Sequence, residues 1–184
     1  MEKVMIFIDG ANLINSVKSV VDRIDIIKLS ERLRCGRNLI RTYYFDGIFP
    51  ADIERIISDE SRIRAFKDKR FRKHQFAKSL YGKGIEFKFV PLKHIGGGKF
   101  IQKGVDVLIS VEMLAHAFLD NYDVAILVSG DGDLAEVVSR IRDLGKVVEV
   151  VANRDNLSPR LLAVADRFID IRDIAGSIRL GGNA

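Results

Sequence analysis

The sequence predicts a three-layer α/β protein, in which helices cover both faces of a central, mostly parallel sheet of five to six strands. Apolar runs predict strands at residues 4–8, 39–45, 85–90, 124–128 and 147–151, with a short sixth strand at 167–170. Because these runs are nearly continuous and do not alternate with polar residues, each strand is expected to be buried on both faces. Helical patterns between them, at residues 11–21, 51–81, 105–119, 134–144 and 158–165, complete the βαβ order of a parallel sheet.

Length and composition narrow the class of protein. A chain of 184 residues favours one domain over residues 1–184, with its core at 3–172 and a C-terminal tail at 173–184. Every apolar run is shorter than the roughly 20 residues that span a bilayer, and the first one ends at Asp9, too early for a signal peptide. The single cysteine, Cys35, excludes an internal disulfide and a cysteine metal cluster. We therefore expect a cytoplasmic protein without a membrane partner.

Positive charge is concentrated in one helix. The chain carries 30 Lys and Arg against 25 Asp and Glu, and residues 62–73 alone hold seven cations and one acid, with Phe66 and Phe71 between them. This pattern favours contact with nucleic-acid phosphates, although a solvated helix face with core phenylalanines is the alternative. A glycine-rich basic segment at 93–103 is expected to be a mobile loop. The candidate nucleic-acid-binding cations are Arg62, Arg64, Lys69, Arg70, Arg72, Lys73, Lys99 and Lys103.

Acidic residues recur where a predicted strand ends or a helix begins, in residues 8–12, 103–106 and 129–133. Ligands of an open parallel sheet bind beyond the carboxyl ends of its strands, so these acids are expected to meet there. Crowded carboxylates are costly unless a cation neutralises them, and oxygen ligands select Mg²⁺ or Mn²⁺. Such an ion polarises a phosphodiester and activates a water molecule. Each motif alone is more typical of a turn or a helix cap, so the prediction depends on all three occurring together.

The same segments closely resemble the NYN family, the LabA-like or DUF88 group of PIN-like nucleases. The resemblance is carried by residues 7–12 (Phe-Ile-Asp-Gly-Ala-Asn), 103–107 (Lys-Gly-Val-Asp-Val) and 127–133 (Leu-Val-Ser-Gly-Asp-Gly-Asp), and it extends over nearly the whole chain. It implies a PIN-like, Rossmann-like sheet and metal-dependent ribonuclease chemistry. Two positions depart from the family pattern: Glu112, where relatives usually carry aspartate, and Leu134, where many carry phenylalanine.

The resemblance also implies roles for individual side chains. Asp9, Asp106 and Asp131 match residues that contact the metal directly or through water. Asp133 matches a further acid of the metal site, which supports the other ligands or orients water. Asn12 matches a polar residue that positions phosphate or water, although a first-turn residue bonded to local backbone is an equal alternative. Ser129 is a candidate phosphate contact, but a role in the turn is favoured. Glu112 is a further candidate acid supporting the site.

Two functions from different classes remain open at this point. The leading hypothesis is a metal-dependent ribonuclease, most consistent with endonucleolytic cutting of RNA, with single-stranded DNA not excluded as a substrate. The alternative is a catalytically weak RNA-binding or regulatory module of the same fold. A phosphatase with a nucleophilic aspartate is disfavoured because Asp9 is followed by Gly-Ala-Asn, without a second acid two residues on. Homodimers are common among PIN-like proteins, so a homodimer is a reasonable expectation.

Overall fold

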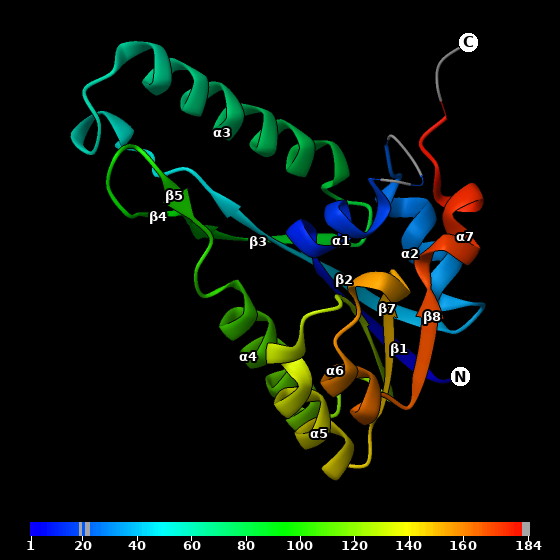
Figure 1. Cartoon of the computed structure of the whole chain (residues 1–184). Helices are drawn as coiled ribbons and strands as arrows, with labels where there is room; N and C mark the ends of the chain where they lie inside the picture. Colours follow the sequence, from blue (N-terminus) through cyan, green and yellow to red (C-terminus); the bar gives the residue numbers. More distant parts are fainter. Residues whose placement is uncertain (19, 21–22, 182–184) are drawn as a thin grey trace.

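The computed structural model describes residues 1–18, 20 and 23–181, and its centre is a parallel sheet of six strands. The strands lie in the order β3-β2-β1-β6-β7-β8, and every neighbouring pair is parallel (Figure 1). This confirms the predicted fold class and all six predicted strands. Their bounds are β1 (Lys3–Asp9), β2 (Asn38–Ile48), β3 (Ile85–Pro91), β6 (Val124–Val128), β7 (Val147–Ala152) and β8 (Arg167–Asp170).

Seven α-helices accompany the sheet in the described part of the chain: α1 (Gly10–Val17), α2 (Ile26–Arg34), α3 (Glu60–Leu80), α4 (Val105–Phe118), α5 (Ala135–Asp143), α6 (Pro159–Val164) and α7 (Ile171–Ile178). Three of the five predicted helices agree closely. The first was predicted over 11–21, but α1 ends at Val17, and the predicted end at Val21 lies outside the described residues. The prediction of one helix over 51–81 was wrong at its start. A 3₁₀ turn, Ile53–Arg55, precedes α3, which begins only after Asp59 accepts a hydrogen bond from the Arg62 amide.

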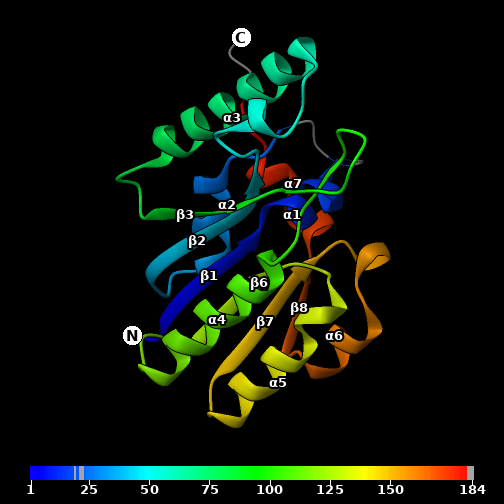
Figure 2. The ribbon, with the colours of Figure 1, turned by 90° about the vertical axis from the view of Figure 1, so that its left-hand side faces the viewer.

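The alternating side chains of the sheet supply two separate cores. On β1, Val4, Ile6 and Ile8 pack toward α1, α2 and α7, while Met5 and Phe7 pack toward α4 and α5. Figure 2 shows α4 and α5 side by side across one face of the sheet. Burial of both faces is what the continuous apolar runs required. No helix among the described residues is long and apolar enough to cross a membrane.

Two helices were not predicted, and both pack on the same face. α2 begins after Asp25, whose carboxylate accepts hydrogen bonds from two amides of its first turn, and ends at Cys35 in the left-handed conformation. α7 packs against α2 and buries Ile174, Ala175 and Ile178 in the core. The first part of the segment expected as a tail from residue 173 is therefore a packed helix. Residues 182–184 lie outside the described residues.

The segment expected as a mobile loop at 93–103 contains a short antiparallel hairpin of β4 (Lys93–His94) and β5 (Phe100–Ile101). Its Phe100 ring contacts Phe66 of α3 and Phe49 after β2, at centroid distances of 5.4 and 5.3 Å. Arg62 donates hydrogen bonds to two carbonyls of the hairpin turn. We call α3 and this hairpin the arm. Figure 1 shows the arm extending away from α4 and α5, which lie on the other face of the sheet.

Replacing Ile178 of α7 by alanine should lower the free energy of unfolding by about 2–5 kcal/mol, because its fully buried side chain would leave a cavity between α7 and the sheet. The matched control is Val111→Ala on α4, where the side chain is 57% exposed and the change should stay within about 0.5 kcal/mol. Urea denaturation measures both. Equal effects would show that residues 173–178 do not pack as described.

Candidate active site

The structure places the acids of two predicted motifs at the ends of neighbouring strands. Asp9 is the last residue of β1, and Asp131 follows β6, which pairs with β1 in parallel register. Asp106 lies in the first turn of α4, on the face of the sheet that Phe7 lines. The three carboxylates therefore come from three segments to the carboxyl edge of the sheet, between strands whose connections leave for opposite faces. This is where open parallel sheets bind ligands.

Asp9 is held at the start of α1 by the backbone. Its carboxylate accepts a hydrogen bond from the Asn12 amide at 3.1 Å, and the side chain of Asn12 accepts one from the Gly130 amide at 2.9 Å. The turn after β1 is thus joined directly to the turn after β6. In the described structure the Nδ2 group of Asn12 makes no hydrogen bond, so it is available to a bound group.

The turn after β6 is stabilised from within. The Ser129 hydroxyl accepts a hydrogen bond from the Asp131 amide at 3.2 Å, and the Asp131 carboxylate accepts one from the Asp133 amide at 3.0 Å. Ser129 is only 1% exposed, which fits a role in the turn and leaves little access for a phosphate. Asp133 is exposed at the surface of this turn.

The three carboxylates also interact electrostatically. Burial raises the pKa of Asp9, the negative charges of Asp131 and Asp106 raise this pKa further, and backbone hydrogen bonds from Asn12 and Ala11 oppose the rise. Ionised Asp9 is thus unfavourably placed unless a positive charge is near. A cation would relieve both the burial and the repulsion.

The donor set consists of carboxylate oxygens, which fit a hard divalent cation such as Mg²⁺ or Mn²⁺. In residues 1–18, 20 and 23–181, however, no group of three or more His, Cys, Asp or Glu side chains lies close enough together to hold a metal ion. Asp9, Asp106 and Asp131 could hold such an ion only if their side chains turned toward one another. These residues therefore fit a divalent cation in the chemistry of their oxygens and in their position at the edge of the sheet.

The comparison with protein families agrees with this geometry. The NYN domain profile matches residues 3–172, which include Asp9, Asp106, Asp131 and Asp133. The chain belongs to the NYN domain family.

This NYN domain is similar to two known proteins at low sequence identity. It is 24% identical over 145 residues to the low amplitude and bright protein LabA of Synechococcus elongatus, covering 76% of this chain and 67% of LabA. The crystal structure of a protein of unknown function from Vibrio parahaemolyticus matches with a TM-score of 0.71 at 23% identity, covering 97% of this chain and 96% of that one. The structural match shows a shared fold.

Glu112 lies apart from the acids of this NYN domain. It is two turns along α4 from Asp106, where its carboxylate pairs with Lys88 of β3 at 3.3 Å and lies 3.7 Å from His116. The His116 ring in turn hydrogen-bonds to the Tyr43 hydroxyl at 3.0 Å. Glu112 therefore belongs to a polar network between α4 and the sheet, and the structure does not bring it to the candidate site.

An acid that sequence reasoning missed lies one strand away from Asp9. Asp46 of β2 is 8% exposed, and its carboxylate accepts a hydrogen bond from Lys73 of α3 at 2.6 Å. Lys73 also bonds to the Gly47 carbonyl, and the Gly47 amide donates to Gln102, which precedes α4. The signal was present, because Asp46 follows an apolar run as Asp9 does, but the strand was predicted to end at residue 45.

The candidate cations of the arm fall into two groups. Arg62, Arg70 and Lys73 use their side chains inside the protein, on carbonyls of the hairpin turn, on the Phe49 carbonyl and on Asp46, respectively. The others are exposed at the surface: Arg64, Arg72, Lys99, Lys69, whose ammonium lies 5.9 Å from the centre of the Phe66 ring, and Lys103, which follows the arm. The predicted basic surface thus exists, but part of it has a structural role.

A second segment packs against the Asp131 turn from the other side. We call residues 153–158, between β7 and α6, the rim loop. The Ser158 amide donates a hydrogen bond to the Gly130 carbonyl at 2.9 Å, and a Cβ atom on Gly130 would lie 2.6 Å from the Asn156 carbonyl oxygen. Only glycine at position 130 lets these two backbones approach so closely.

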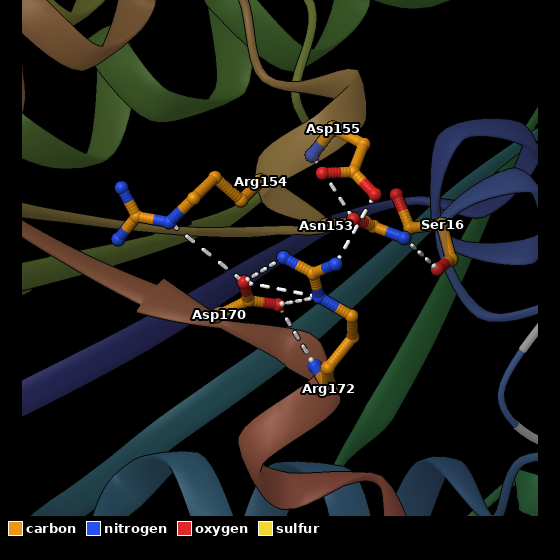
Figure 3. A network of polar contacts seen from close by, with 6 residues as sticks. All are labelled: Ser16, Asn153, Arg154, Asp155, Asp170 and Arg172. Atoms are coloured by element: carbon orange, nitrogen blue, oxygen red, sulfur yellow. Dashed lines mark hydrogen bonds and ion pairs between the residues drawn. The ribbon is translucent and has the colours of Figure 1, made fainter.

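Polar contacts fix the rim loop to the rest of the sheet, as Figure 3 shows. The Asn153 side chain donates to the Ser16 carbonyl at 3.2 Å and accepts from the Asp155 amide at 3.0 Å. Arg172 donates to the Asp170 carboxylate at 2.7 Å and to Asp155 at 3.1 Å. The hydrogen bonds from Arg172 hold the pKa of Asp170 below its usual value. The loop beside the candidate site is thus positioned by an ordered ion network.

Replacing Gly130 by alanine should destabilise the protein by about 1–3 kcal/mol, because the new methyl group would meet the backbone of the rim loop. The control is Gly176→Ala in α7, where a Cβ atom meets nothing within 4 Å. This change should be neutral or stabilising by up to about 1 kcal/mol, since alanine favours the helix. Thermal and urea unfolding of both variants test the prediction. A neutral Gly130→Ala would mean that the two turns are not in contact.

Proposed function

We propose that this NYN domain is a metal-dependent ribonuclease that cuts phosphodiester bonds of RNA at the carboxyl edge of its sheet. The observation that carries the proposal is the convergence of Asp9, Asp106 and Asp131 from three segments, close enough for two of the charges to raise the pKa of the third. The family has a nuclease-like fold, and a substrate of nucleic acid follows from that relationship. The exposed cations of the arm match the charge of such a substrate.

In this proposal each side chain has a distinct task. A divalent ion held by Asp9, Asp106 and Asp131 would polarise the scissile phosphate and lower the pKa of a water molecule. Asn12 keeps Asp9 and the Asp131 turn in register through its bond to Gly130, and its free Nδ2 group can donate to a phosphate oxygen. Asp133, exposed beside Asp131, can orient water.

The second candidate function is RNA binding without cutting. It is favoured by one observation: within the described residues, the acids do not form a ready set of metal ligands. Under this alternative the basic arm binds RNA, while the acids hold a metal or merely order loops, as Asp9 and Asp131 do in capping α1 and the turn after β6. Both functions therefore predict that the protein binds RNA, but only the first predicts that it cuts RNA.

Changing Asp9 to Asn should reduce Mg²⁺- or Mn²⁺-dependent cleavage of labelled single-stranded RNA by about 100-fold or more. The lost metal contact is worth several kcal/mol in the transition state, and each 1.4 kcal/mol is about tenfold in rate. Gel analysis of cleavage products with and without each metal measures the effect.

The control for this experiment is Asp143→Asn, which removes one exposed carboxylate at the far end of α5 and should leave cleavage unchanged. Both variants must keep the wild-type unfolding midpoint. If the wild-type protein binds the RNA but leaves it intact with either metal, the RNA-binding module becomes the better account.

The arm should supply much of the electrostatic affinity for RNA. Replacing Arg64 and Arg72 together by glutamine should lower the slope of log Kd against log salt by about 1.4, because each phosphate contact to a single strand contributes about 0.7. Fluorescence anisotropy with labelled RNA measures this slope. The matched control is Arg32→Gln with Arg140→Gln, which removes the same charge from α2 and α5. An equal loss in the control would assign the effect to net charge alone.

A further inference from the structure

Arg154 lies on the rim loop, and contacts with Phe168 and Asp170 orient its side chain. Its guanidinium lies over the Phe168 ring at 5.0 Å from the centroid, and its Nε is 4.0 Å from Asp170. Asp170 already receives several hydrogen bonds from Arg172, which lie at 2.7 to 3.2 Å (Figure 3). The Arg154 side chain is 65% exposed and donates no hydrogen bond within the described part of the chain. Its donors are therefore held in place but open to a ligand.

Arg160 adds a second cation beside the same turn. It lies in the first turn of α6, two residues after Ser158, which contacts both Gly130 and Gly132 of the Asp131 turn. Its side chain is exposed and has neither a hydrogen-bond nor an ion-pair partner among the described residues. The nearby acids Asp155 and Asp170 are both bound by Arg172, so they oppose an approaching anion less than free carboxylates would.

The order of the strands sets these arginines opposite the arm. The arm lies at the β3 and β2 end of the sheet, the acids lie at β1 and β6, and the rim loop follows β7 beside β8. Along the carboxyl edge of the sheet, the cations of the arm come first, the acids come next, and Arg154 and Arg160 come last. Six strands span about 24 Å at a spacing of about 4.8 Å. A polyanion crossing the acids therefore meets positive charge on both sides.

We propose that Arg154 and Arg160 form a second nucleic-acid-binding site, which holds the phosphates of a single RNA strand on the side of the acids away from the arm. This inference rests on the proposed function and defines its substrate class. The bound strand then extends to both sides of the acids.

The test measures binding without chemistry, using labelled 2′-O-methyl RNA in the absence of metal. The variant Arg154→Gln with Arg160→Gln is compared with the arm variant Arg64→Gln with Arg72→Gln and with the control Arg32→Gln with Arg140→Gln. Oligonucleotides of about 4 and about 16 nucleotides are used, which bracket common single-strand site sizes. The rim variant should lower the salt slope by about 1.4 on the long oligonucleotide and have a smaller effect on the short one.

Each outcome discriminates between the proposals. A rim variant that binds the long oligonucleotide as the control does, while the arm variant binds more weakly, would overturn the second site and leave the ribonuclease proposal intact. A wild-type protein that binds neither oligonucleotide would overturn both. Loss of binding must occur with an unchanged unfolding midpoint. The conservative variant Arg154→Lys with Arg160→Lys should restore most of the salt slope, because it keeps the charge.

Discussion

The whole arrangement depends on the pairing of β1 with β6 in the middle of the sheet. From β1 the chain builds outward through β2 and β3, and from β6 it builds outward through β7 and β8. The helix after β1 lies on one face and the helix after β6 lies on the other. Open parallel sheets bind ligands at such a point, and the acids Asp9 and Asp131 lie there. The hydrogen bond from the Gly130 amide to Asn12 joins the two turns.

Much of the fold could be predicted because both faces of the sheet are buried. Fully buried parallel strands require nearly continuous apolar runs, and those runs gave the strands within a few residues. The helix α2 was harder to predict, because its short amphipathic pattern is interrupted by charged residues and begins at a cap, Asp25, that resembles many turn residues. The start of α3 was obscured for a related reason: residues 51–59 are compatible with a helix, and only the cap at Asp59 sets the boundary.

The candidate site was predictable in part. Acids that follow apolar strands gave Asp9 and Asp131, since parallel strands bring their carboxyl ends to one edge. Contacts between distant segments leave no such signal in the sequence. The hydrogen bond between Asn12 and Gly130 spans 118 residues. The ion pair between Glu112 and Lys88 depends on how α4 is positioned on the sheet. The same is true of the arm cations, whose division into exposed and internal groups follows from where the hairpin packs.

The helix α7 bears on where this protein can be divided. The family match ends at residue 172, one residue after α7 begins, yet this helix supplies Ile174, Ala175 and Ile178 to the core. The Asp25 amide, at the start of α2, also bonds to the Ile178 carbonyl. A fragment cut at the family boundary would therefore lose part of the cover of one sheet face and expose an apolar surface prone to aggregation. Recombinant fragments and fusion junctions for this family member belong beyond residue 181.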